Sequence, residues 1–202
     1  SVAATLVRRI REIQPSGAYH IAGRCASGVI ALEAAAQLIE AGCEVPLLAL
    51  IESPNPEPYR RTPRWKLKAS IWRHRISKFT GMDVAAAARY AFGGVKKLVG
   101  SAGPEPAVDS TQCAILEYTP GTYPGRMAVV AGLDRPALPD LESDWKGVAM
   151  KGLEVYRVPG GHDSMFDEPH VADLGRRLND LLESAKPAAA APRGLTPTAD
   201  IR

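Results

Sequence analysis

The sequence predicts an α/β fold in which helices cover both faces of a mostly parallel sheet. Predicted strands and helices alternate along the chain, which is the order that produces parallel strands joined by crossover helices. In addition, the run VPLLALI at residues 45–51 is apolar at almost every position. A strand with two apolar faces is buried on both, as in a sheet that lies between two layers of helices.

Hydrophobic periodicity and turn residues place the individual elements. The predicted elements are, in order, a helix at 2–13, a strand at 18–22, a helix at 28–41, a strand at 45–51, helices at 65–79 and 83–99, strands at 126–131 and 153–158, and a helix at 168–184. Pro54, Pro56 and Pro58 predict an irregular connection after the second strand, because proline lacks the N–H group that regular structure uses.

We expect one domain over residues 1–185, with a helical insert at about 57–108 and a disordered tail at 186–202. The tail lacks the apolar periodicity that forms a core. The chain opens directly in a predicted helix, so we expect the first strands of the domain to precede Ser1.

Composition excludes several classes of function. The chain has 202 residues, of which 46% are hydrophobic, and a net charge of +3, which is too weak to argue for binding to nucleic acid. No apolar run approaches the roughly 20 residues that span a bilayer, so we expect no membrane association. Cys25, Cys43 and Cys113 are too far apart for a metal-ligand pair and form no disulfide pattern, which favours a cytoplasmic location and no metal site.

A predicted strand–turn–helix junction presents the first candidate for chemistry. The sequence GRCASG at residues 23–28 surrounds Cys25 with the small residues that a sharply turning backbone requires. A position beside a helix N-terminus favours the thiolate form of a cysteine. The alternative is a buried structural cysteine in a tight turn. Ser27 is a rival nucleophile, but β-branched Val29 fits a turn centred on Ser27 poorly, so we expect Ser27 to cap the helix.

Two further side chains at predicted strand ends complete a nucleophilic set. His162 follows the last strand in a glycine-rich loop, where it can act as the base that a cysteine nucleophile needs. Glu52 ends the strand after the nucleophile helix and can orient the histidine. Each has an ordinary alternative, an exposed loop histidine and a strand-terminating acid. The chain order Cys25, Glu52, His162 is that of α/β-hydrolases, so the sequence predicts this fold and a cysteine triad.

Three motifs then resemble the thioesterase domain that ends nonribosomal peptide and polyketide synthases. Residues 10–42 are similar to that family's helix, elbow and following helix. Residues 118–132 resemble its entry into a late strand, and residues 158–178 resemble its histidine loop and final helix. The resemblance covers about residues 1–184 and implies an α/β-hydrolase fold with an inserted helical lid.

The resemblance also implies a role for each candidate residue. Cys25 would be the nucleophile, His162 the base and Glu52 the orienting acid, and the backbone N–H of Ala26 would contribute to the oxyanion hole. The family usually has serine as nucleophile and aspartate as acid, so both positions depart from its common pattern, although members with cysteine are known. The implied domain binds no cofactor of its own.

The insert carries many basic residues, and no acid lies between Glu57 and Asp83. We expect an acidic acyl or peptidyl carrier protein to bind it and to deliver the substrate on its phosphopantetheine. The alternative is a solvated helix face. The residues expected to contact substrate or carrier are Arg60, Arg61, Arg64, Lys66, Lys68, Arg73 and Arg75.

The predicted function is release of an acyl or peptidyl chain from a carrier thioester through a Cys25 acyl-enzyme, by hydrolysis or cyclisation. A cysteine nucleophile converts one thioester into another, so the acyl-enzyme keeps its activation. Two alternatives stay open. One is a stand-alone hydrolase of esters or lactones with the same triad, and the other is a catalytically silent module that docks carrier proteins.

Overall fold

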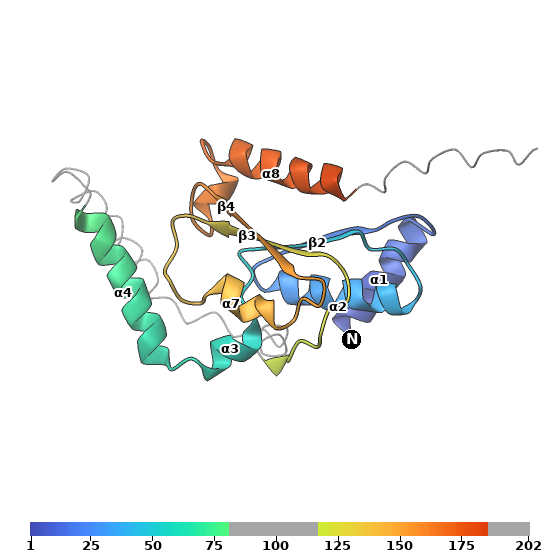
Figure 1. Ribbon diagram of the computed structural model, residues 1–202, viewed down its shortest axis with the longest axis horizontal. Coiled ribbons are helices and arrows are strands. Elements are labelled where there is room, and N and C mark those ends of the chain that lie inside the picture. The colour runs from blue at the N-terminus through green and yellow to red at the C-terminus, as the bar shows by residue number, and fades with distance from the viewer. Residues whose placement is uncertain (81–116, 186–202) are drawn as a thin grey trace, which may run out of the picture.

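The structure, a computed structural model, describes residues 1–80 and 117–185 and contains a four-stranded sheet (Figure 1). Neighbouring strands are parallel and lie in chain order. The strands are β1 (His20–Arg24), β2 (Leu47–Ile51), β3 (Met127–Gly132) and β4 (Leu153–Val158). The parallel α/β prediction is confirmed. The predicted helix at 83–99, the later part of the insert and the predicted tail at 186–202 lie outside the described residues.

Helices cover the two faces of the sheet, as Figure 1 shows. One face packs against α2 (Ser27–Glu40) and α7 (Leu141–Lys146), with α1 (Val2–Ile13) behind α2. The other face packs against α8 (Val171–Ser184), which follows the short 3-10 helix η1 (Ser164–Phe166). The sheet is therefore the middle of three layers.

Strand β2 shows why this chain needs both outer layers. Its side chains alternate between the faces, so that Leu48 and Leu50 belong to the core beneath α2 and α7. Leu47, Ala49 and Ile51 belong to the core beneath α8. All five residues are buried, which is why the apolar run predicted a strand covered on both sides.

Among the described residues, helices cover only one face of strand β1. Ile21 and Gly23 pair in register with Leu48 and Leu50, on the face of α2. Arg24 pairs with Ile51, whose side chain lies on the face that carries α8, and Arg24 is exposed there. The last residue of β1 therefore presents its side chain to the side from which the β4–α8 loop approaches.

The segment after β2 corrects one prediction. Residues expected to be irregular form α3 (Pro56–Arg61), and α4 (Arg64–Thr80) follows it. Asn55 caps α3 by accepting a hydrogen bond from the Glu57 N–H at 3.0 Å. Pro56 and Pro58 lie in the first turn, where backbone N–H groups have no partner within the helix, so proline is tolerated there.

Helix α4 confirms the helix predicted at 65–79, whereas α7 was not predicted. In the described part of the chain, no helix combines the length and the apolar character that crossing a membrane requires.

The surroundings of Asp144 in α7 disfavour the ionised form of its carboxyl group. Burial is the main cause that raises its pKa from 3.8 to about 6, and the nearby carboxylate of Asp140 adds to the effect, while Arg135 opposes it. Because the folded-state pKa lies above the ordinary value, the ionised form destabilises the fold. The loss of folding stability that ionised Asp144 causes is complete above about pH 6, and it disappears as the pH falls towards 3.8.

We therefore predict that Asp144→Asn stabilises the protein at pH 8 but not at pH 4. In a site without solvent, a pKa shift of this size corresponds to a few kcal/mol of unfolding free energy. Because the Asp144 carboxyl is half-exposed, solvent screening reduces the expected increase in unfolding free energy to about 1 kcal/mol. Urea unfolding of both proteins at the two pH values measures it. Glu142→Gln, which removes an exposed acid from the same helix, is the control. An equal gain at both pH values would contradict ionisation as the cause.

Candidate active site

The carboxyl ends of the parallel strands meet at one edge of the sheet, and a pocket of about 420 Å³ lies there. Cys25 follows β1, Glu52 follows β2, Asp134 follows β3 and His162 follows β4, and all four line this pocket. Its other walls are mainly apolar and include Val29, Pro54, Tyr59, Leu67, Ile71 and Leu138. The structure thus brings together the three residues that the sequence predicted as a triad.

Cys25 occupies a sharp turn between β1 and α2. Its backbone has a φ of 51°, which is unusual for a residue other than glycine, and its N–H donates to the Ile51 carbonyl at 2.9 Å. The turn needs glycine on both sides. A Cβ on Gly23 would lie 2.6 Å from the Gly28 Cα, and one on Gly28 would lie 2.2 Å from the Ser53 Oγ. Strand and helix therefore approach each other closely beneath the cysteine.

Ser27 fastens this turn, in a way that differs from the prediction. Helix α2 already begins at Ser27 and the preceding Ala26 has helical backbone angles, so Ser27 does not cap the helix. Its hydroxyl instead accepts a hydrogen bond from the Arg24 N–H at 3.1 Å and donates to the Arg24 carbonyl at 2.7 Å. These bonds hold the residue that precedes Cys25.

The backbone N–H of Ala26 is a candidate oxyanion donor. Ala26 lines the pocket beside Cys25, and among the described residues its N–H has no hydrogen-bond acceptor. It also lies at the N-terminus of α2, where the helix dipole favours negative charge. A negatively charged oxygen next to Cys25 would find a donor there.

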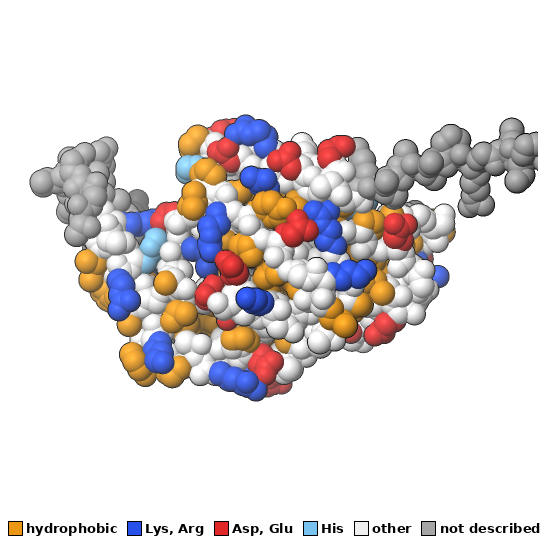
Figure 2. Space-filling model, in the orientation of Figure 1, with side chains coloured by type: hydrophobic (Ala, Val, Ile, Leu, Met, Phe, Trp, Pro, Cys, Tyr) orange, Lys and Arg blue, Asp and Glu red, His pale blue; other side chains and the backbone are white. Residues whose placement is uncertain are grey.

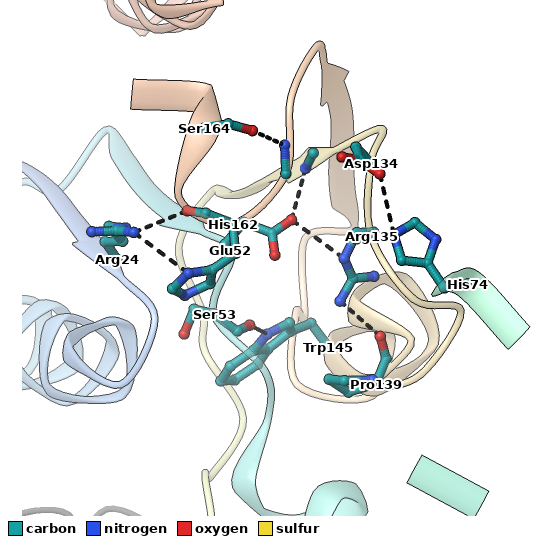
Figure 3. A network of polar contacts seen from close by, with 12 residues as sticks. Arg24, Glu52, Ser53, His74, Asp134, Arg135, Pro139, Trp145, His162 and Ser164 are labelled. Carbon is teal, nitrogen blue, oxygen red and sulfur yellow. Dashed lines mark hydrogen bonds and ion pairs between the residues drawn. The ribbon is translucent and has the colours of Figure 1, made fainter. Parts of the chain in front are cut away.

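Glu52 is buried, with 5% of its surface exposed, and its backbone also has a positive φ, of 48°. Its Oε1 accepts a hydrogen bond from the Gly132 N–H at 2.7 Å and lies 3.3 Å from the Arg135 Nε (Figure 3). Arg135 in turn donates to the Pro139 carbonyl at 2.9 Å. The negative charge of Glu52 is thus offset by Arg135, and its role as the orienting acid stays a prediction.

His162 has other partners in the structure. Its Nδ1 lies 2.9 Å from an Asp163 carboxylate oxygen and 3.4 Å from the Arg24 guanidinium. In the described chain no hydrogen bond joins His162 to Glu52, and Figure 3 shows the Glu52 carboxylate directed to Arg135. The sequence analysis did not identify Arg24 or Asp163. The signal that could have identified them is their position, because Arg24 directly precedes Cys25 and Asp163 directly follows His162.

Asp134, at the end of β3, was also missed, and it joins the pocket to helix α4. Its carboxylate accepts from the His74 Nε2 at 3.1 Å and pairs with Lys78. Ser70 accepts from the Leu138 N–H at 2.9 Å. Ser70, His74 and Lys78 recur every four residues, so they share one face of α4. The contacts made by this face hold α4 beside the pocket, and Leu67 and Ile71 of the same helix line the pocket.

The predicted basic residues fall into two groups. Arg60 donates to the Tyr118 carbonyl at 3.1 Å, and Arg61 pairs with Glu57 at 2.7 Å, so these two have partners within the domain. The residues whose side chains are exposed along α4 are Arg64, Lys66, Lys68, Arg73 and Arg75. Figure 2 shows basic and hydrophobic side chains mixed over this helix, whose sequence contains no acid.

No group of three or more His, Cys, Asp or Glu side chains within residues 1–80 and 117–185 is arranged to hold a metal ion. The positions of Cys25, His162 and the Ala26 N–H around one pocket can support nucleophilic attack by Cys25, with proton transfer to His162 and stabilisation of an oxyanion at Ala26.

The parallel sheet, the strand–turn–helix elbow and the histidine loop define an α/β-hydrolase. Within that class, the chain belongs to the thioesterase domain family, whose model matches residues 1–180. It is accordingly an enzyme domain of the hydrolase type.

Solved structures with this fold include thioesterase domains. A covalent complex of the NocB thioesterase domain with a fluorophosphonate nocardicin G analogue has 25% sequence identity and a TM-score of 0.59, and the match covers 90% of this chain and 73% of that one. The thioesterase domain SrfTE, described in the cyclisation of the lipopeptide antibiotic surfactin, has 15% identity and a TM-score of 0.56, over 89% of this chain and 73% of its own, and shows the fold alone.

Relatives in sequence are much longer proteins. The bikaverin polyketide synthase bik1 of Gibberella fujikuroi is 41% identical over 63 residues, which are 31% of this chain and 3% of that protein. The chondramide synthase cmdD of Chondromyces crocatus is 42% identical over 52 residues, which are 26% of this chain and 1% of that protein. The chain thus matches a very small part of each of these synthases.

Proposed function

We propose that this domain releases an acyl or peptidyl chain from the phosphopantetheine thioester of a carrier protein, with Cys25 as the nucleophile. The observation that carries the proposal is the convergence of Cys25, His162 and the Ala26 N–H on one pocket with apolar walls. The family assignment and the relatedness to polyketide and peptide synthases support a carrier-bound substrate.

The proposed first step transfers the acyl group to the enzyme. The imidazole of His162 takes the proton of the Cys25 thiol, and the sulfur attacks the carbonyl carbon of the substrate. The oxygen becomes negative and accepts a hydrogen bond from the Ala26 N–H. The bond between the carbonyl carbon and the phosphopantetheine sulfur then breaks, and the departing sulfur takes the proton from His162.

The second step frees the chain. Water, or a hydroxyl or amine of the chain itself, gives its proton to His162 and attacks the Cys25 thioester. The bond between the carbonyl carbon and the Cys25 sulfur breaks, and the cysteine regains its proton. Because both thioesters have similar energy, the chain stays activated on the enzyme, which leaves internal nucleophiles able to compete with water.

We predict that Cys25→Ala lowers kcat/KM by at least about 10³-fold, because the acyl-enzyme cannot form. Cys25→Ser should still be acylated, but it holds the chain as a less activated ester, so the ratio of hydrolysed to cyclised product changes. Product analysis by mass spectrometry measures both effects. Cys43→Ala, which removes a free cysteine that does not line the pocket, is the matched control. Full turnover by Cys25→Ala would contradict the proposal.

We further propose that the exposed basic residues of α4 attract an acidic carrier protein. Reversing charges in Lys68→Glu/Arg73→Glu should lower kcat/KM for a carrier-delivered substrate by about tenfold at low salt and leave turnover of a small free thioester within about twofold. Arg8→Glu/Arg11→Glu, which reverses two exposed charges on α1, is the control. Equal losses on both substrates would refute carrier recognition by α4.

The same assays address the two alternatives. A stand-alone hydrolase would turn over short esters or lactones faster than acyl thioesters, and a silent docking module would bind the carrier without turnover. A cytoplasmic location also remains a proposal, supported by Cys25 and Cys43, which carry free thiols in the described part of the chain.

A further inference from the structure

The contacts of His162 identify an acid that the triad prediction did not include. Asp163 places one carboxylate oxygen 2.9 Å from the His162 Nδ1. The carboxylate of Glu52, by contrast, is bonded to the Gly132 N–H and lies against Arg135. Glu52 lines the same pocket as His162, but among the described residues Asp163 is the acid in hydrogen-bonding contact with the imidazole.

The partner of Nδ1 decides whether the ring can act as a base. A carboxylate only accepts hydrogen bonds and a guanidinium only donates them, so Asp163 and Arg24 favour opposite tautomers. With Asp163 as partner, Nδ1 carries the proton and Nε2 is free to take the proton of Cys25. With Arg24 as partner, Nε2 would carry the proton and could not. The 2.9 Å contact with Asp163 is shorter than the 3.4 Å contact with Arg24.

The guanidinium of Arg24 donates hydrogen bonds that hold the Asp163 carboxylate beside His162. Its Nη2 donates to the same Asp163 oxygen at 2.7 Å and to the His162 carbonyl at 2.9 Å. Its guanidinium also lies over the ring of Phe166, 4.4 Å from the ring centre. These contacts fix the carboxylate and the backbone of the histidine loop, and Ser27 holds the backbone of Arg24 through two hydrogen bonds.

The Arg24 contacts also connect the two halves of the site. Arg24 directly precedes Cys25, on the sheet face from which the β4–α8 loop approaches. One side chain thus ties the turn that holds the cysteine to the loop that holds the histidine. The pKa of Asp163 is lowered chiefly by its hydrogen bond with His162, then by the imidazole charge and by Arg24, so the carboxylate stays ionised into more acidic solution than an ordinary aspartate.

We infer that Asp163 is the positioning acid of His162 and that Arg24 holds it in place, so that this pair, rather than Glu52, sets the imidazole tautomer needed to activate Cys25. The inference rests on the proposed function of Cys25 and His162. Because Asp163 is exposed, its effect should be smaller than the roughly 10⁴-fold effect of a buried triad aspartate.

The test measures the rate of acylation of Cys25 by an acyl thioester, with rapid quenching and mass spectrometry, in the intact protein that carries this domain. Asp163→Asn should lower this rate by about 10- to 100-fold with little change in KM, because an amide can donate to Nδ1 and favour the inactive tautomer. Asp163→Glu should restore part of the rate. Asp167→Asn, which removes an exposed acid of the same loop, should stay within about twofold of wild type.

Each outcome decides a different question. Acylation of Asp163→Asn at the wild-type rate, or no rescue by Asp163→Glu, would overturn the inference. A folded Glu52→Gln variant with a larger loss than Asp163→Asn would assign the role to Glu52 instead. If Glu52→Gln fails to fold because Arg135 loses its partner, the Asp163 variants decide alone. Absence of acylation at Cys25 in the wild type would refute the proposed function itself and the inference with it.

Discussion

The close contact between strand β1 and helix α2 is the constraint on which the site depends. A Cβ on Gly23 would clash with the backbone of Gly28, and a Cβ on Gly28 would clash with the side chain of Ser53, so both positions require glycine. The chain between them must turn within a few residues, which places Cys25 at the tip with a positive φ and leaves the Ala26 N–H at the start of α2. The geometry of the pocket therefore depends on glycine at positions 23 and 28.

The parallel sheet brings the residues that follow its other strands to the same edge as Cys25. Because all four strands run in one direction, the residues after each strand end at the same edge, although Cys25 and His162 are far apart in the sequence. The acids gathered there are each offset by a cation. Arg135 faces Glu52, Arg24 faces Asp163, and Lys78 of α4 faces Asp134. Such pairing reduces the cost of placing several charges around an apolar pocket.

The sequence was sufficient for the parts of this architecture that follow from local patterns. The apolar run of β2 and the helical periodicity of α1 and α8 reflect which faces are buried, so these elements were predicted and confirmed. Helix α3 was missed because proline was weighed as a helix breaker, without allowing for its tolerance in a first turn. The thioesterase family and the α/β-hydrolase fold were also predicted and confirmed.

The sequence was less informative about the partners of each site residue. Glu52 lines the same pocket as His162 and Asp163 follows His162 in the chain, and no local pattern tells which of the two turns its carboxylate towards the imidazole. That choice depends on Arg135 and Arg24, whose long side chains cross between strand ends. The catalytic roles of Cys25, Glu52 and His162 remain predictions for the same reason.

The most direct test of the account is to locate the acyl group on the enzyme during turnover. The intact protein would be mixed with its carrier-bound acyl thioester, quenched in acid, digested and mapped by mass spectrometry. The account predicts an acyl group on Cys25, attached through a thioester that hydroxylamine removes. An acyl group on Ser27, or turnover without any acylated residue in the elbow, would contradict it.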